Sequence, residues 1–216
     1  MIPKKLHRVV PSVTTPKVEE YWVKWQELHP DWEHYTWRDP IDPDDFGLGH
    51  LWELCVSGAQ MAGMMRLEIL LHHGGVYVDS DLEPLKALDP LCNVSAFGVW
   101  EDNFCVPDFI IAAEPQHSAI KACIEMVTRL PREAMFDPHT GPWTSGPGVT
   151  TAVFPHHDVK LHPPVVFAPV HWTQREKLAG FVPGPDTYAI HHWAASWQGA
   201  RGHNAEGSEL WKPKMK

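Results

Sequence analysis

An acidic pair in the middle of the chain has the residue types and spacing of a divalent-cation site. Asp79 and Asp81 directly follow the short apolar run Val76-Tyr77-Val78, which the sequence predicts to be a strand. Two carboxylates at positions i and i+2 of extended backbone point the same way, and ligands bind beyond the carboxyl ends of strands in open α/β sheets. Crowded carboxylates favour a cation, and oxygen ligands suit Mg²⁺ or Mn²⁺. The residues alone therefore predict a metal site, with a chance Asp-x-Asp sequence of no function as the alternative.

A second Asp-x-Asp sequence, Asp42-Pro43-Asp44, receives a different interpretation. With 13 aspartates among 216 residues, about one such pair is expected by chance. This second pair has no strand before it, carries a proline in its middle and lies within a predicted loop over 38–50. We interpret it as a solvated loop.

A long helix and several strands would have to position Asp79 and Asp81. The spacing of apolar residues predicts a helix over 57–73, with Ser57 as its N-cap and Gly74 as its stop, and this helix carries Arg66. Helices are also predicted over 16–28 and from Pro115, and strands over 6–10, 34–37, 76–78, 96–100 and 109–113. The alternation of strands and helices predicts an α/β fold with a mainly parallel open sheet flanked by helices.

The C-terminal third of the chain has a different composition. Nine of the 21 prolines fall between 138 and 185, and no helical periodicity is found there. We expect a proline-rich lobe that packs on the same core, so that 1–198 form a single domain. Residues 199–216 are expected to be a frayed tail.

Charge and composition exclude several classes of function. The chain has 18 Lys and Arg against 27 Asp and Glu, for a net charge of −9, whereas nucleic-acid binders need a basic face. No apolar run reaches the ~20 residues that a bilayer span needs, and no signal-peptide pattern follows Met1. We therefore expect no nucleic-acid partner, no membrane span and a cytoplasmic location.

Four blocks of the sequence resemble one enzyme family. The segment from Met65 to Asp81, MRLEILLHHGGVYVDSD, is similar to the signature of DXD-containing sugar-transfer glycosyltransferases. This is the family 32-like group, related to yeast initiating α-mannosyltransferases and to the catalytic domains of clostridial glucosylating toxins. The other blocks occur in the family's order, and the resemblance covers about 2–198. They are Ile2–His7, Thr144–Pro147 and Tyr188–Trp197.

The resemblance implies a GT-A-like fold and a set of site residues. The carboxylates would hold Mn²⁺ or Mg²⁺ against the diphosphate of a nucleotide sugar, and the first would also reach the ribose. The implied catalytic residues are Asp79, Asp81 and Arg66; the metal ligands are Asp79, Asp81 and His191, with His192 as the alternative third ligand; and the donor contacts are His7, Arg66, Asp79, Ser196 and Trp197.

The implied activity is transfer of a sugar from a UDP- or GDP-sugar, with retention of its anomeric configuration. A cation that bridges the two phosphates would stabilise the leaving nucleoside diphosphate, and a nearby arginine would assist it. The acceptor, whether protein, lipid or glycan, is left open by the sequence. Two other interpretations remain: a degenerate member of the family that binds a nucleotide or glycan without turnover, and a metal-dependent phosphohydrolase.

This chain departs from the family pattern in places that bear on the donor. Ala62-Gly63 stands where the family has Ser-Asp, so a carboxylate that would contact the donor is missing. Val10 stands where relatives often have an aromatic residue that stacks on the base. The chain is also short for the family, which favours a protein of a bacterium or of a phage-infected host cytosol.

Overall fold

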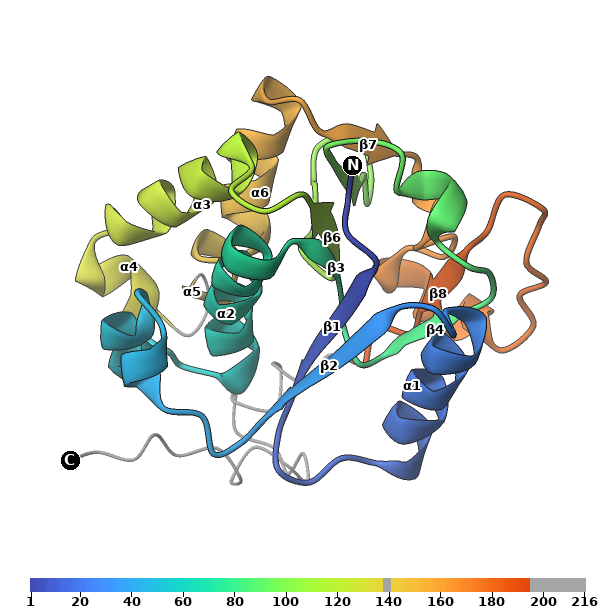
Figure 1. Cartoon of the computed structure of the whole chain (residues 1–216), viewed down its shortest axis with the longest axis horizontal. Coiled ribbons are helices and arrows are strands. Elements are labelled where there is room, and N and C mark those ends of the chain that lie inside the picture. The colour runs from blue at the N-terminus through green and yellow to red at the C-terminus, as the bar shows by residue number, and fades with distance from the viewer. Residues whose placement is uncertain (138–140, 195–216) are drawn as a thin grey trace.

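The computed structural model describes residues 1–137 and 141–194, which form an α/β fold around a six-stranded sheet (Figure 1). The sheet consists of β1 (Lys5–Val10), β2 (Glu33–Arg38), β3 (Gly75–Val78), β5 (Ala96–Val99), β6 (Ile110–Ala113) and β7 (Lys160–His162). Its strand order is β2-β1-β3-β6-β5-β7. A separate two-stranded sheet pairs β4 (Leu82–Pro84) with β8 (Ala189–His191).

The expected mainly parallel sheet is confirmed, with one strand reversed. β1 runs parallel to both β2 and β3, and β5 runs parallel to β7. β6 runs antiparallel to both of its neighbours, β3 and β5. The connection from β5 to β6 contains no crossover helix, so the chain turns back and pairs antiparallel. As a result, the start of β6 lies beside the end of β3.

The helices form a layer on each side of the main sheet. In Figure 1, α2, α3 and α6 lie on one side of the sheet, and α1 lies on the other with the β4–β8 pair. The helices are α1 (Pro16–Leu28), α2 (Gly58–His73), α3 (Ser118–Thr128), α4 (Arg132–Phe136), α5 (Gly141–Thr144) and α6 (Pro147–Val153). Short 3₁₀ helices are η1 (Pro43–Asp45), η2 (Gly49–Leu54), η3 (Asp89–Leu91), η4 (Phe154–His156), η5 (Pro164–Val166) and η6 (Trp172–Leu178).

The signals that begin and end α2 act as the sequence predicts. The Ser57 side chain accepts a hydrogen bond from the backbone N–H of Gln60, and Gly74 ends the helix with a φ of +60°. A Cβ at position 74 would lie 2.6 Å from Pro115 Cδ, so the chain needs a glycine here for both conformation and space. The stop at Gly74 leads directly into β3 and thereby fixes where the acidic pair falls.

Two details in the later part of the chain differ from what the sequence suggests. The helix expected from Pro115 begins at Ser118, where the His117 side chain accepts a hydrogen bond from Ala119 N–H. Between 138 and 185, where the sequence shows no helical periodicity, the chain forms the α-helices α5 and α6. These helices are too short to show a periodic pattern, and in α6 a proline occupies the first turn, where it is tolerated.

β3 is buried between the two helical layers, and its side chains alternate between them. Val76 and Val78 belong to the cluster that contains Trp22 and Trp25 of α1, whereas Tyr77 belongs to the cluster that contains the methionines of α2. Each large apolar side chain buried in this way stabilises the fold by about 2 kcal/mol. The end of β3 is therefore held firmly from both sides.

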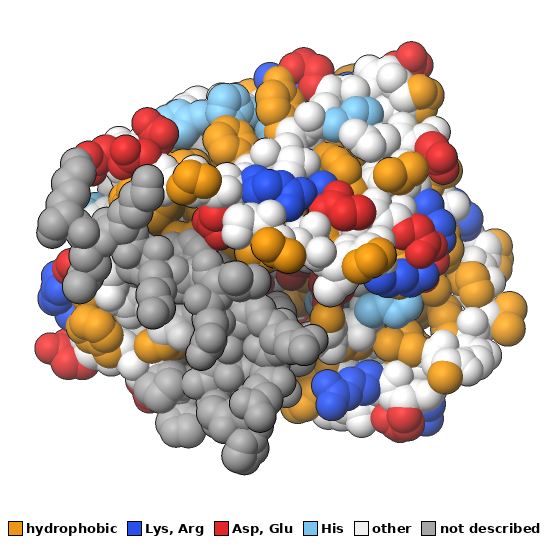
Figure 2. All heavy atoms as spheres, turned by 90° about the horizontal axis from the view of Figure 1, so that it is seen from below, with side chains coloured by type: hydrophobic (Ala, Val, Ile, Leu, Met, Phe, Trp, Pro, Cys, Tyr) orange, Lys and Arg blue, Asp and Glu red, His pale blue; other side chains and the backbone are white. Residues whose placement is uncertain are grey.

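Charged side chains of both signs are mixed on the surface. On the face shown in Figure 2, lysine and arginine side chains lie among aspartate and glutamate side chains. Among the described residues, no helix has both the length and the apolar character that crossing a membrane requires. The predicted tail, 199–216, lies outside the described residues, and the domain limits and the cytoplasmic location stay predictions.

Candidate active site

Asp79 and Asp81 lie in the tight turn that connects β3 to β4. Leu82 N–H donates to the Asp79 carbonyl at 3.1 Å, which closes the turn. Asp79 N–H donates to the Phe109 carbonyl at 2.8 Å and so ties the turn to the segment before β6. The expected position at the carboxyl end of a strand is correct, but the expected extended geometry is wrong. A turn, and not strand alternation, brings the two carboxylates together.

The pairing of β4 with β8 adds His191 to the acidic pair. Leu82 pairs with His191 in this small sheet, and His191 Nε2 lies 3.1 Å from Asp81 Oδ1. The other oxygen of that carboxylate, Oδ2, accepts a hydrogen bond of 2.8 Å from Ala194 N–H. One ligand atom from each of Asp79, Asp81 and His191 lies within 4.8 Å of the others. We call these three residues the acidic cluster.

The structure distinguishes between the two histidines that the sequence left open. His191 faces Asp81, and its side chain is 7% exposed. His192 faces the other way: its Nε2 lies 2.9 Å from Glu83 Oε2, and its ring stacks on Tyr21 at 5.2 Å. This alternation follows from the strand geometry of β8, and it places His191 beside the acidic pair.

Arg66 of α2 reaches the acidic cluster from the opposite layer. Its Nη2 lies 3.1 Å from Asp79 Oδ1, its Nη1 lies 3.2 Å from Asp108 Oδ2, and its side chain is 5% exposed. The guanidinium also lies 4.4 Å from the centre of the Tyr77 ring, and the Tyr77 hydroxyl donates to Asp79 Oδ1 at 3.0 Å. Packing and two ion pairs thus hold Arg66 in one orientation.

Asp108 is a residue of this site that the sequence interpretation missed. It precedes β6, and the antiparallel register pairs Ile110 with Val78, immediately before Asp79. The signal in the sequence was weak, since the position of Asp108 depends on the direction of β6. Once β6 is known to run antiparallel, a carboxylate just before its start is expected beside the end of β3.

The electrostatic environment gives the two carboxylates of the DXD sequence different pKa values. Burial, together with the neighbouring carboxylates of Asp81 and Asp108, raises the pKa of Asp79 to about 6 despite the opposing effect of Arg66. Burial also acts to raise the pKa of Asp81, but His191 and the N–H of Ala194 outweigh it and lower that pKa to about 2. Burial acts to lower the pKa of His191, yet Asp81 and Asp79 outweigh it and raise it.

His7 is not brought to the acidic cluster. Its side chain is fully buried, its Nε2–H donates to the Gly74 carbonyl at 2.9 Å, and its Nδ1 accepts from the indole of Trp37 at 3.5 Å. Its ring stacks on Tyr35 at 5.0 Å. This position gives the predicted donor contact no support, and the role stays a prediction. Ser196 and Trp197, the other predicted donor contacts, lie outside the described residues.

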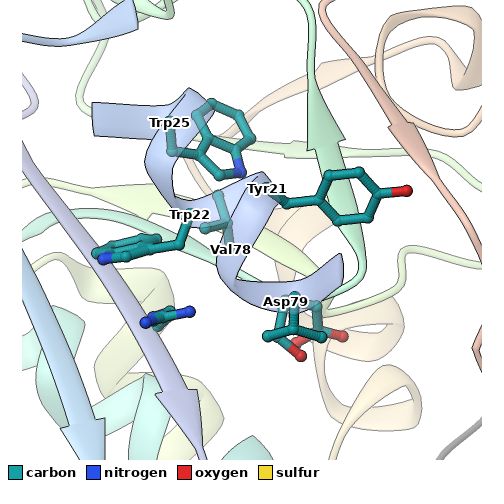
Figure 3. A pocket seen from close by; sticks show the side chains of 8 residues that line it. Tyr21, Trp22, Trp25, Val78 and Asp79 are labelled. Carbon is teal, nitrogen blue, oxygen red and sulfur yellow. The ribbon is translucent and has the colours of Figure 1, made fainter. Parts of the chain in front are cut away.

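A narrow gap beside Asp79 separates the end of β3 from α1. In Figure 3, Tyr21, Trp22 and Trp25 come from α1, while Val78 and Asp79 come from the end of β3. Arg8 also lines this gap; its guanidinium carbon lies 4.6 Å from the centre of the Trp22 ring, and its Nη1 is buried without a protein partner. The gap is narrow because aromatic side chains of α1 fill most of the space on this side of the site.

A larger cavity of about 700 Å³ lies between β2 and α2. It is lined in part by Trp37, Phe46 and His73, and no member of the acidic cluster lines it. Arg66 is not among its lining residues either. The cavity is therefore separate from the chemistry described above.

The acidic pair lies in a region of the chain that matches a known family model. Residues 15–97, which include Asp79 and Asp81, match the family model described as the glycosyltransferase sugar-binding region containing DXD motif. The resemblance to the DXD-containing glycosyltransferases is confirmed. Inositol phosphoceramide mannosyltransferase 3 of Schizosaccharomyces pombe is 26% identical over 200 residues, which are 88% of this chain and 49% of that protein. Mannosyl phosphorylinositol ceramide synthase CSH1 of Saccharomyces cerevisiae is 29% identical over 126 residues, 54% of this chain and 33% of that protein. The chain thus spans less than half the length of these two relatives.

Solved structures of glycosyltransferases share the fold. The galactosyltransferase LgtC, solved with donor and acceptor sugar analogues, superposes with a TM-score of 0.55 at 9% identity, covering 96% of this chain and 91% of that one. The PaToxG glycosyltransferase superposes with a TM-score of 0.54 at 15% identity, covering 71% of this chain and 69% of that one. At these identities the likeness establishes the fold, and the expected GT-A-like architecture is confirmed.

Proposed function

We propose that this DXD-family chain is a metal-dependent glycosyltransferase that moves a sugar from a nucleotide-sugar donor with retention of configuration. The observation that carries the proposal is the convergence of Asp79, Asp81 and His191, drawn from the β3–β4 turn and β8, with Arg66 against Asp79. Ligands of open α/β sheets bind at such a strand end. The proposal uses the same residues as the family resemblance, except that His7 has no contact with the cluster.

The acidic cluster fits a divalent cation. Two carboxylates and one imidazole suit Mn²⁺ or Mg²⁺. The Nδ1 atom of His191 is buried without a protein partner, and the Nε2 atom lies against Asp81, so the imidazole has bonding capacity that the described residues do not use. Bound there, a cation would supply Lewis-acid stabilisation of the charge that grows on a leaving diphosphate.

The protein's own groups orient this site before any ligand binds. Tyr77 and Arg66 hold one oxygen of Asp79, and His191 and Ala194 N–H hold the two oxygens of Asp81. Groups fixed in this way need little reorganisation during the reaction. Arg66 adds a permanent positive charge next to the proposed diphosphate position. Ser196 and Trp197 are retained in the proposal as contacts to the donor.

The names of the fungal relatives suggest which substrates to test first. One is named as an inositol phosphoceramide mannosyltransferase and the other as a mannosyl phosphorylinositol ceramide synthase. We therefore place a mannosyl nucleotide among the UDP- and GDP-sugars and a phosphoinositol-bearing lipid among the acceptors. Protein and glycan acceptors remain in the panel, because the loops that bind acceptors are not determined by a metal site.

A hydrolysis and transfer panel tests the proposal. The purified chain is incubated with UDP- and GDP-sugars, with and without Mn²⁺, and release of the nucleoside diphosphate is followed. We expect Mn²⁺-dependent turnover of one donor and an α-linked product. Stabilisation by a nucleoside diphosphate plus Mn²⁺ without turnover would indicate the degenerate binding protein instead. Release of inorganic phosphate from a generic phosphoester, with indifference to nucleotide sugars, would indicate a phosphohydrolase.

A further inference from the structure

Asp108 occupies a position that the missing side chain of Gly63 leaves open. A Cβ placed on Gly63 would lie 3.4 Å from Asp108 Oδ2, 3.8 Å from the Ser145 carbonyl and 4.0 Å from Gly146 Cα. A methyl group therefore fits at van der Waals contact, whereas a side chain with its own carboxylate would extend towards the carboxylate of Asp108. Position 63 and Asp108 thus share one small space.

Arg66 connects this space to the acidic cluster. Gly63 and Arg66 are three residues apart on α2, so they lie on the same face of the helix. The guanidinium contacts Asp108 through Nη1 and Asp79 through Nη2, at 3.2 and 3.1 Å. It also donates through Nη1 to the Asp108 carbonyl and through Nε to the Ala62 carbonyl. Asp108 therefore anchors the side of Arg66 that faces away from Asp79.

The second anchor also affects the charge of the site. A guanidinium with Asp79 as its single partner would neutralise that carboxylate and weaken its attraction for a cation. Because Arg66 contacts both Asp79 and Asp108, its single positive charge neutralises neither carboxylate completely. With Asp81, the three carboxylates and one guanidinium leave two net negative charges, which a divalent cation would neutralise. The side chain of Asp108 is 14% exposed, so solvent screens this contribution only in part.

We infer that Asp108 is a positioning residue, which supplies from the start of β6 the carboxylate that α2 lacks at position 63. It holds Arg66 in the orientation that Asp79 and the donor diphosphate require. A small residue is needed at position 63, because a longer acidic side chain there would extend into the space of the Asp108 carboxylate. The effect of Asp108 on catalysis rests on the proposed function. The competition for space between a side chain at position 63 and the Asp108 carboxylate does not.

A double-mutant cycle between the two positions tests the inference. The variants are Asp108→Ala, Gly63→Asp and the combination, with Gly63→Ala as the matched control that adds a Cβ without a carboxylate. Asp108→Ala is expected to lower kcat about tenfold with little change in the donor KM, because Arg66 acts on charge that develops in the transition state. Gly63→Asp alone is expected to be impaired, because it places two carboxylates in contact. The double variant is expected to recover about tenfold over Gly63→Asp.

A binding readout separates this inference from the proposed function. The affinity for Mn²⁺ with UDP or GDP is measured calorimetrically for the same variants, which requires no turnover. Coupling between positions 63 and 108 in this affinity, in a chain that turns over no nucleotide sugar, would support the inference while the proposed function fails. In an active chain, additive effects of the two substitutions, or an Asp108→Ala variant with wild-type kcat, would overturn the inference. Should Asp108→Ala not fold, Asp108→Asn takes its place, because it keeps the side-chain volume and removes the charge.

Discussion

Asp81 Oδ1 lies 3.1 Å from His191 Nε2, although 110 positions separate the two residues in the chain. The contact depends on the antiparallel pairing of β4 with β8, which sets Leu82 opposite His191. The turn after β3 supplies Asp79 and Asp81, and the small sheet adds His191 to them. The proline-rich C-terminal region is therefore part of the site as well as part of the packing.

The substitution Asp81→Asn is expected to abolish Mn²⁺-dependent turnover and to leave the fold intact. An amide keeps the shape of the side chain but provides a single neutral acceptor, so the cluster loses one of its two anionic ligands. Turnover of the nucleotide-sugar panel and the far-UV circular dichroism spectrum provide the two measurements. An Asn variant that turns over donors as well as the wild type would contradict the assignment of the metal site.

Replacing His191 is expected to weaken Mn²⁺ binding, whereas replacing His192 is not. His191→Ala removes the proposed ligand beside Asp81 and should lower the affinity at least about tenfold, as loss of supporting groups at metal sites does. His192→Ala is the matched control, since that ring pairs with Glu83 and stacks on Tyr21. Titration of the two variants with Mn²⁺ in parallel measures the difference. A larger loss for His192→Ala would assign the third ligand to His192.

The strand before the acidic pair and the helix that carries Arg66 could be predicted from local signals. Ser57 and Gly74 delimit α2, and the glycine leads directly into β3. These signals act within a few residues, so a single sequence displays them. The position of the two carboxylates of the proposed metal site follows from the same reasoning, because both come immediately after the strand.

The remaining parts of the site depend on contacts between distant segments. The reversed direction of β6 places Asp108 beside Arg66, and the β4–β8 pairing places His191 and not His192 beside Asp81. Neither pairing leaves a periodic pattern in strands of three or four residues. The place of His7 in the sequence could not show which way its side chain points. In the structure it is 0% exposed and packs against Tyr35 instead of facing the acidic cluster.

The stability of the protein is expected to fall as the pH decreases from about 6.5 towards 4, partly because of His7. Burial lowers the pKa of His7 from 6.5 to about 4, and its bonds to Gly74 and Trp37 fit the neutral tautomer. Between these two values the unfolded state binds more protons than the folded state, so the free energy of unfolding rises with pH. His7 accounts for about 3 kcal/mol of this change at most.

Urea denaturation across this pH range tests the role of His7. The wild type is compared with His7→Gln, which removes the titrating group and keeps a side chain that can donate to the Gly74 carbonyl. We expect the variant to show a smaller increase in the free energy of unfolding between pH 4 and 6.5. Parallel curves for the two proteins would show that His7 does not titrate differently on folding.

Arg66 is expected to stabilise the fold most strongly at neutral and alkaline pH. Arg66→Ala leaves Asp79 and Asp108 without their cationic partner, and breaking a buried pair in this way costs about 3 kcal/mol or more. Arg66→Lys should recover only part of this loss, because a single ammonium cannot reproduce the fork that reaches both carboxylates. The donor chemistry is not needed for this measurement, so it tests the geometry alone.

The loss in the free energy of unfolding caused by Arg66→Ala should also depend on pH, and the pKa of Asp79 determines whether that loss grows or shrinks as the pH rises. The pKa of Asp79 is already raised to about 6 with Arg66 present, and loss of the guanidinium raises it further. A carboxyl whose pKa is raised on folding contributes stability that is present below its unfolded pKa and is lost as the pH rises through the folded value. The variant should therefore be closer to the wild type at pH 5 than at pH 8 in urea denaturation. Equal stability of the two proteins at pH 8 would contradict the charge arrangement described for this site, because at that pH the variant leaves Asp79 and Asp108 ionised without the guanidinium that pairs with both.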